Sequence, residues 1–273
     1  MEIVRERMWN VGMKLSISNI AWKKEHDKEM YQVCRDMGYH GIEIAPSRIF
    51  GKYPYKNMKE AYEYRDELKK LYHLEVSSVQ SIWYGKQGFL FKEDYDLFVD
   101  YTYQVIRFAS QLGAGNIVFG SPEIRRIFQP EDYQKGMKFF VNISRYAEKY
   151  NTVFSIEANP AVYGTNYINE TLEAVDIVKR IGSEHLKVNL DIGTIICNDE
   201  GIDRVVENIA LIHHVHFSEP YLMLLKERQI HKEIIKILKD AEYKNYISIE
   251  MKCQENLEDV KRVMEYVCLL NDT

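Results

Sequence analysis

Short apolar segments of five to eight residues alternate along the chain with longer segments whose apolar positions recur at helical spacing. The short segments are rich in Ile, Val and Phe, as expected for strands of a parallel sheet that is buried on both faces. They predict eight strands, at Lys14–Ile20, Gly41–Ala45, Leu74–Ser81, Asn116–Gly120, Thr152–Ala158, Leu186–Asp191, His213–Ser218 and Tyr246–Met251.

Each predicted strand is followed by a predicted helix. In the segment Glu93–Leu112, for example, Phe98, Val105 and Ile106 belong to an apolar stripe at helical spacing, and Gly113 supplies a residue suited to a left-handed cap. The predicted helices are Lys28–Met37, Lys59–Tyr72, Glu93–Leu112, Glu131–Tyr150, Glu170–Ile181, Ile202–Ile209, Leu225–Asp240 and Leu257–Leu270.

Eight alternating units of this kind predict an α/β fold, a (β/α)8 barrel, whose typical length is about 250 residues. The alternative is a doubly wound sheet, whose dinucleotide motif GxGxxG lies between a strand and a helix. Gly113-Ala-Gly115 instead follows a helix and precedes a strand, so it does not match. No shift in composition marks a domain boundary, so we expect a leader over residues 1–12 and one barrel domain over residues 13–273.

The composition is that of a globular protein, with 46% hydrophobic and 28% charged residues among 273. A net charge of −5 disfavours a globally basic nucleic-acid binder. No apolar run approaches the ~20 residues of a membrane span, and the first ten residues lack the apolar core of a signal peptide. The four cysteines form no CxxC pair, which is typical of free thiols in a reducing compartment. We therefore expect a cytoplasmic protein without nucleic-acid or membrane partners.

Polar residues end four of the late predicted strands: Glu157, Asp191, His216 and Glu250. The carboxyl ends of barrel strands surround the active site, so these side chains are expected to converge. Three neighbouring carboxylates repel one another and are costly to bury unpaired, which favours a compensating divalent cation. Oxygen ligands with one His suit Mn²⁺ or Mg²⁺ best, with Zn²⁺ or Co²⁺ as alternatives. His214 shares the strand face of His216, and His213 is expected to point the other way.

The strand-end motifs carry a family resemblance. They read Gly41-Ile-Glu43-Ile44, Ser155-Ile-Glu157-Ala-Asn159-Pro160, Asn189-Leu-Asp191, His214-Val-His216-Phe217 and Ser248-Ile-Glu250. Over nearly the whole chain, the sequence resembles the xylose isomerase-like TIM barrels. It is most similar to the sugar phosphate isomerase/epimerase group, which includes ketose 3-epimerases and hydroxypyruvate isomerases. This resemblance implies that the four strand-end residues Glu157, Asp191, His216 and Glu250 bind one divalent metal.

The resemblance also implies an activity, that of a metal-dependent sugar or sugar phosphate isomerase or epimerase. The metal would hold the carbonyl oxygen and a neighbouring hydroxyl of the carbohydrate and, as a Lewis acid, stabilise a cis-enediolate. Glu157 and Glu250 would remove and return the proton as general bases and acids. Barrels of this family are often homodimers or homotetramers, so the resemblance leaves the oligomeric state open, with either assembly possible.

Other polar and aromatic residues near strand ends are candidates for binding substrate, because amides suit hydroxyl groups and aromatic faces suit the C–H faces of sugars. These candidates are Asn19, Trp22, Glu43, Gln80, Trp83 and Asn159. Arg125 could bind a phosphate or carboxylate through bidentate hydrogen bonds. The alternatives are rim packing for the tryptophans, an ion pair with Arg48 for Glu43, and a solvated charge for Arg125.

Two positions depart from the family pattern. Thr194 stands where a His usually follows the strand-six Asp, and Glu219-Pro220 stands near the usual place of a substrate-binding Arg. We place Thr194 in the substrate site, and His231 could replace the missing group or lie on a helix surface.

These departures keep two alternative functions open: a non-catalytic barrel that binds a sugar-like ligand, and a dehydratase acting on an inositol-type ketone. An abasic-site endonuclease is disfavoured. It needs a His-rich three-zinc site and a basic groove for DNA.

Overall fold

The computed structural model describes residues 13–272, so the leader expected over residues 1–12 lies outside the described residues and stays a prediction. Eight parallel strands close into a barrel in chain order, and pairing of the first with the last completes it. The strands are β1 (Lys14–Ser18), β2 (Gly41–Ile44), β3 (Glu75–Val79), β4 (Asn116–Phe119), β5 (Val153–Glu157), β6 (Leu186–Asp191), β7 (Ile212–Ser218) and β8 (Tyr246–Glu250). The predicted (β/α)8 barrel is confirmed.

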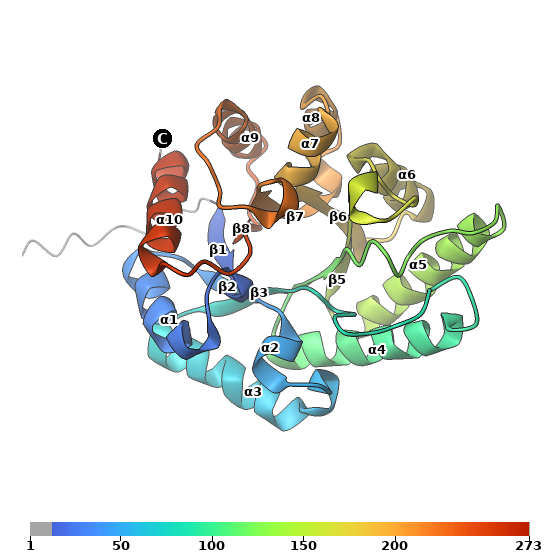
Figure 1. The fold of residues 1–273 in the computed structure, drawn as a ribbon, viewed down its shortest axis with the longest axis horizontal. Coiled ribbons are helices and arrows are strands. Elements are labelled where there is room, and N and C mark those ends of the chain that lie inside the picture. The colour runs from blue at the N-terminus through green and yellow to red at the C-terminus, as the bar shows by residue number, and fades with distance from the viewer. Residues whose placement is uncertain (1–12, 273) are drawn as a thin grey trace, which may run out of the picture.

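Helices surround the barrel in chain order, from α1 near the first strand to α10 beside the last (Figure 1). They are α1 (Asp27–Asp36), α3 (Met58–Glu67), α4 (Tyr95–Leu112), α5 (Asp132–Lys149), α6 (Thr171–Ile181), α8 (Asp203–Glu207), α9 (Gln229–Asp240) and α10 (Leu257–Asp272). The predicted helices overlap all of these. Within the described residues, no helix is long and apolar enough to cross a membrane.

Two short helices that were not predicted follow strand ends directly. α2 (Pro46–Phe50) begins with Pro46 in its first turn, where the missing N–H of proline has no intrahelical role. α7 (Ile192–Asn198) is capped by Asp191, whose Oδ1 accepts the N–H of Thr194 at 2.5 Å. Helices of five and seven residues are too short to produce a recognisable periodicity in the sequence.

The core lies between the barrel and its surrounding helices. A group of aromatic rings illustrates the packing, because Phe119 of β4 contacts Phe139 and Phe140 of α5 and Phe154 of β5 at centroid distances of 5.3–5.6 Å. All four side chains are fully buried. This packing fixes the strands, and the strands in turn fix the polar residues at their carboxyl ends.

Candidate metal centre and its cavity

The four predicted ligands meet at the carboxyl end of the barrel. Glu157, Asp191 and Glu250 are the last residues of β5, β6 and β8, and His216 lies two residues before the end of β7. One ligand atom from each residue lies within 4.8 Å of those of the other three. His216 is fully buried, and Glu157 and Glu250 are less than a tenth exposed. Four separate strands thus bring three carboxylates and one imidazole together.

The imidazole of His216 lies between carboxylates on both sides. Its Nδ1 is 2.8 Å from Glu157 Oε1 and 3.2 Å from Glu250 Oε2, and its Nε2 is 3.0 Å from Glu43 Oε2. Burial alone would lower the pKa of His216, but the charges of Glu43 and Glu250 and the hydrogen bond to Glu157 raise it well above its usual value. A proton on Nδ1 therefore supplies the positive charge that holds Glu157 and Glu250 together in this arrangement.

The three carboxyl groups at the centre have divergent pKa values. Burial raises the pKa of Glu250 to about 7 and that of Asp191 to about 6, and the charge of Glu157 adds to both shifts. Burial also acts to raise the pKa of Glu157, but its hydrogen bond to His216 and the charge of that imidazole lower the pKa overall. These carboxylates repel one another when they are ionised, and a bound cation would relieve that repulsion.

Neighbouring side chains hold the carboxylates in place. Ser218 Oγ donates to Asp191 Oδ2 at 2.5 Å, and the backbone N–H of Thr194 donates to Asp191 Oδ1. Asn189 Nδ2 donates to Glu157 Oε1 at 2.7 Å. Buried oxygen ligands, one imidazole nitrogen and a supporting shell of hydrogen bonds fit a divalent cation, with Glu157, Asp191, His216 and Glu250 as the residues that could hold it.

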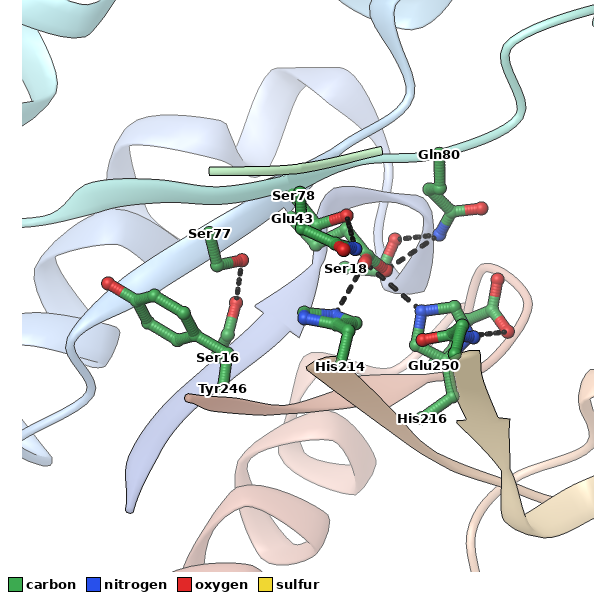
Figure 2. A network of polar contacts seen from close by, with 12 residues as sticks. Ser16, Ser18, Glu43, Ser77, Ser78, Gln80, His214, His216, Tyr246 and Glu250 are labelled. Carbon is green, nitrogen blue, oxygen red and sulfur yellow. Dashed lines mark hydrogen bonds and ion pairs between the residues drawn. The ribbon is translucent and has the colours of Figure 1, made fainter. Parts of the chain in front are cut away.

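Glu43, predicted to bind substrate, lies behind the centre instead. It is fully buried, and its Oε2 is 2.9 Å from His214 Nε2 and 3.0 Å from His216 Nε2 (Figure 2). Burial acts to raise the pKa of Glu43, but the charge of His216 and the neighbouring His214 lower it overall. The alternative pairing with Arg48 does not occur, because Arg48 binds Asp27. Glu43 therefore orients the imidazole of His216.

A cavity of about 390 Å³ opens at the carboxyl ends of the strands, beside the four clustered residues. Three of them, Glu157, Asp191 and Glu250, line it, and so do Gln80 and Asn159 from the predicted substrate-binding set. The other lining residues are Ser81, Val118, Gly120, Ser121, Pro122, Tyr163, Ser218, Glu219, Tyr221 and Leu222.

Three predicted substrate-binding residues from the early strands are buried away from this lining. Asn19 Oδ1 accepts the N–H of Ala45 at 3.0 Å, which ties the end of β1 to the end of β2. Trp22 Nε1 donates to Asp27 Oδ1 at 2.9 Å. Trp83 Nε1 donates to Thr102 of α4, and its ring packs within the aromatic core. The two tryptophans thus pack within the protein, which agrees with rim packing, the alternative to substrate binding.

Arg125, predicted to bind an anionic group, is fully buried and binds the backbone instead. Burial lowers the pKa of its guanidinium to about 10. Its nitrogens donate at 2.8–3.3 Å to the backbone carbonyls of Phe119, Gly120, Glu157, Tyr167 and Ile168. Arg125 therefore joins the segments that follow β4 and β5, and each of its three nitrogens donates to a backbone carbonyl.

Thr194 and His231 also lie outside the cavity lining. The hydroxyl of Thr194 donates to the carbonyl of Ala158 at 2.9 Å, so it joins α7 to the end of β5. His231 of α9 is fully buried and stacks on Phe217, with its Nδ1 3.1 Å from the hydroxyl of Tyr266. Burial lowers the pKa of His231 to about 4, so the ring is a neutral packing group.

The prediction that His213 points away from the barrel interior was wrong. The pairing of β6 with β7 shifts register between Val188 and Asn189, and such an irregularity breaks the strict alternation of side chains. His213 Nδ1 lies 3.1 Å from Asn116 Oδ1 of β4, three strands away around the barrel, which it can reach only through the interior.

Among the lining residues that the sequence does not single out are Tyr163, Tyr221 and Glu219, which follow strand ends in loops. Tyr163 and Tyr221 place their rings 5.4 Å apart in an edge-to-face pair, and Glu219 is 3% exposed. Tyr221 belongs to a turn in which it and Leu222 both have positive φ, of 61° and 52°. Glu219 directly follows β7, so its position at a strand end could have marked it as a site residue. No feature of the sequence marks the aromatic pair.

The comparisons with known proteins agree with this geometry. A family model described as the xylose isomerase-like TIM barrel matches residues 31–269. The structure of 3-keto-D-glucoside 4-epimerase from E. coli superposes with a TM-score of 0.75 at 16% identity, covering 94% of this chain and 99% of that one.

Two further solved structures have the same fold. D-psicose 3-epimerase from Clostridium cellulolyticum H10, solved with D-tagatose, superposes with a TM-score of 0.74 at 15% identity, covering 95% of this chain and 97% of that one. A probable 3-DHS dehydratase from Bacillus anthracis superposes with a TM-score of 0.70 at 15% identity, covering 96% and 99%. No curated protein sequence matches this chain.

Proposed function

Because the chain belongs to the xylose isomerase-like TIM barrel family, we propose that it is a divalent-metal-dependent sugar isomerase or epimerase. The observation that carries this proposal is the convergence of Glu157, Asp191, His216 and Glu250 beside a cavity. Solved structures of the same fold include a 4-epimerase of a keto-glucoside and a 3-epimerase of a ketose, which supports the class of reaction. Family membership and this convergence point to proton transfer at a carbon next to a carbonyl group.

The four clustered residues would hold one divalent cation. Mn²⁺ or Mg²⁺ suits three carboxylates and one imidazole best, with Zn²⁺ or Co²⁺ as alternatives. When bound, such a cation supplies a Lewis acid that increases the acidity of the carbon next to the substrate carbonyl. The ligand His216 would then be neutral, with Nδ1 toward the cation and Nε2–H donated to Glu43.

Glu157 and Glu250 would move the proton. Both line the cavity and come from strands three apart in the barrel, β5 and β8, so they reach a substrate from different sides. Both are carboxylates beside the cavity, so each can accept a proton from a substrate carbon and return it. Epimerisation uses one residue on each face of the reacting carbon, whereas isomerisation moves a proton between neighbouring carbons.

The test is exchange of a substrate proton with solvent. Protein saturated with Mn²⁺ is incubated in D₂O with a panel of ketoses and aldoses, and deuterium in the recovered sugar is measured by NMR. We expect exchange in the wild-type protein and a loss of at least about 100-fold in Glu157→Gln and in Glu250→Gln. Glu75→Gln is the matched control, because Glu75 is an exposed carboxylate at the start of β3.

Two other outcomes would replace this proposal. Loss of water from the substrate would indicate a dehydratase, which is the activity named for one structure of the same fold. Absence of any exchange with Mn²⁺, Mg²⁺, Co²⁺ or Zn²⁺ would leave a barrel that binds a sugar-like ligand without turnover.

A further inference from the structure

The charged side chains of the described residues that line the cavity are all carboxylates. Glu219, which follows β7, adds a fourth carboxylate to those of Glu157, Asp191 and Glu250. Within the described chain, residues 13–272, no Lys, Arg or His lines the cavity. The electrostatic character of the wall is therefore set by carboxylates.

Two arginines lie close to this wall, and both are already bound. Arg228 donates from Nε and Nη2 to the two oxygens of Glu219 at 2.6 Å each, in the bidentate geometry that fixes both groups. Arg125 donates to backbone carbonyls and is fully buried. Neither guanidinium therefore directs a pair of N–H donors into the cavity. A phosphate or carboxylate bound there would need such a pair.

The formal charge of the occupied site can be counted from these groups. Glu157, Asp191 and Glu250 with one divalent cation leave a charge of −1, and the pair of Glu219 with Arg228 is neutral. A low-dielectric cavity strengthens the repulsion between this charge and a second anion. Like-charge juxtaposition of this kind disfavours an anionic ligand, in addition to the lack of an attractive contact.

The rest of the wall suits neutral hydroxyl and C–H groups. Asn159 is 7% exposed, and its Oδ1 is buried at the cavity with no protein partner among the described residues. An unpaired acceptor in this position is satisfied by a hydroxyl donor, and a phosphate dianion has no donor to offer. The edge-to-face pair of Tyr163 and Tyr221 supplies an apolar surface for the C–H face of a sugar.

Gly120 keeps the floor of the cavity open beside these groups. A Cβ at this position would lie 2.7 Å from Glu157 Oε2 and 3.4 Å from Asn159 Oδ1. A side chain at Gly120 would therefore occupy the space in front of the proposed base and the unpaired acceptor.

From this wall we propose that the substrate is an uncharged polyhydroxylated carbonyl compound, a free sugar rather than a sugar phosphate or a sugar acid. The inference rests on the proposed function, because it names the substrate class of the same site. For a sugar phosphate or sugar acid to be preferred, a positively charged side chain would have to line the cavity.

The test compares matched pairs of compounds with Mn²⁺-saturated protein at one ionic strength. Solvent-deuterium exchange is measured for D-fructose, D-fructose 6-phosphate and the keto acid 5-keto-D-gluconate, and then for the other free ketoses and their phosphates. We expect kcat/KM for the best free ketose to exceed that for its phosphate by at least about 100-fold. Equal or faster exchange with a phosphate or a sugar acid overturns the inference and leaves the proposed function standing.

A pair of variants separates charge from shape. Pro122 lines the cavity and has no positive φ, so Pro122→Lys introduces a cation and Pro122→Met introduces a chain of similar length without charge. We expect Pro122→Lys to raise the ratio of phosphate to free-sugar kcat/KM at least tenfold, relative to Pro122→Met. Equal ratios in the two variants contradict the electrostatic argument.

Absence of exchange with every compound would be a failure of the proposed function, and binding then tests the inference separately. The same compounds, together with inorganic phosphate, are added to the Mn²⁺-saturated protein and the Tm is measured. A rise in Tm with free sugars alone supports the inference. A rise with phosphates or sugar acids, or no rise with any compound, overturns it.

Discussion

Glu43 illustrates how a single buried residue shapes the candidate metal centre. Its Oε2 is within 3.0 Å of two imidazole nitrogens, Nε2 of His214 and Nε2 of His216. With a cation bound and His216 neutral, accepting its Nε2–H would select the tautomer whose unprotonated Nδ1 faces Glu157 and Glu250. Metal-binding histidines are commonly held by a carboxylate in this way.

We expect Glu43→Gln to weaken Mn²⁺ binding by about 10–100-fold, because the amide no longer fixes the tautomer of His216. The affinity is measured by isothermal titration of the metal-free protein. The matched variant Glu75→Gln alters an exposed carboxylate of the next strand and should bind Mn²⁺ with the wild-type affinity. If Glu43→Gln also bound Mn²⁺ with wild-type affinity, the orienting role would be refuted.

We expect Arg125 to stabilise the loops around it and not to bind a ligand. Arg125→Met leaves several buried carbonyls without a donor, so the free energy of unfolding should fall by about 3 kcal/mol or more. Arg126→Met, which alters the exposed neighbour, should change it by less than about 0.5 kcal/mol. Both values are measured by urea denaturation. A stable Arg125→Met variant that has lost only substrate affinity would restore the anion-binding interpretation.

The segment that follows β7 lines the cavity and contains two residues in a strained backbone conformation. Tyr221 and Leu222 both have positive φ, which costs a non-glycine residue about 1–2 kcal/mol. Three hydrogen bonds hold the turn: the N–H of Leu222 donates to Glu219 O, the N–H of Lys252 donates to Leu222 O, and the N–H of Tyr221 donates to the hydroxyl of Tyr163. The aromatic pair depends on this turn.

Removing one of these hydrogen bonds should loosen the turn without unfolding the barrel. Tyr163→Phe deletes the acceptor that lies 2.7 Å from the N–H of Tyr221, a loss of about 1 kcal/mol. We expect KM for the best free ketose to rise about 3- to 10-fold with kcat nearly unchanged. Tyr53→Phe, at an exposed tyrosine, is the control. A fall in kcat with no change in KM would contradict a role in holding substrate.

The regular strands and helices could be predicted from the sequence, whereas the direction of side chains in the loops could not. The eight strands and the long helices follow from apolar periodicity, and the metal-centre residues follow from the rule that strand ends converge. Trp22 and Trp83 lie a few residues beyond a strand, where the direction of a side chain depends on loop conformation that periodicity does not encode. The burial of Arg125 depends on carbonyls from two separate loops, which no local pattern reveals.

At the scale of the whole molecule, barrel closure gathers charges that are far apart in the sequence. The net charge of −5 includes Glu157, Asp191 and Glu250, which lie together and not on the solvated surface. Asp191 and Glu250 have pKa values raised to about 6 and about 7. Their contribution to stability is therefore present at low pH and is lost as the pH rises through 6–7.

Because protons and the cation compete for the same side chains, the rise in Tm caused by Mn²⁺ should depend on pH. Ligation requires ionised carboxylates and a neutral His216, so protons compete with the cation below about pH 7. The rise in Tm caused by saturating Mn²⁺ should be larger at pH 8 than at pH 5, by about 5 °C or more. Calorimetry of the metal-free and the Mn²⁺-saturated protein across this range measures it. A constant rise, or one that shrinks with pH, would contradict the assigned protonation states.

If side chains from four strands hold one cation, Mn²⁺ titration of the full chain should find a single site that depends on them. Equilibrium dialysis should give one tightly bound Mn²⁺ per wild-type chain, and binding should be lost in the double variant Asp191→Asn/Glu250→Gln. Circular dichroism should show that the variant is folded. A wild-type protein that binds no divalent cation, or a double variant that retains full binding, would rule out this metal centre.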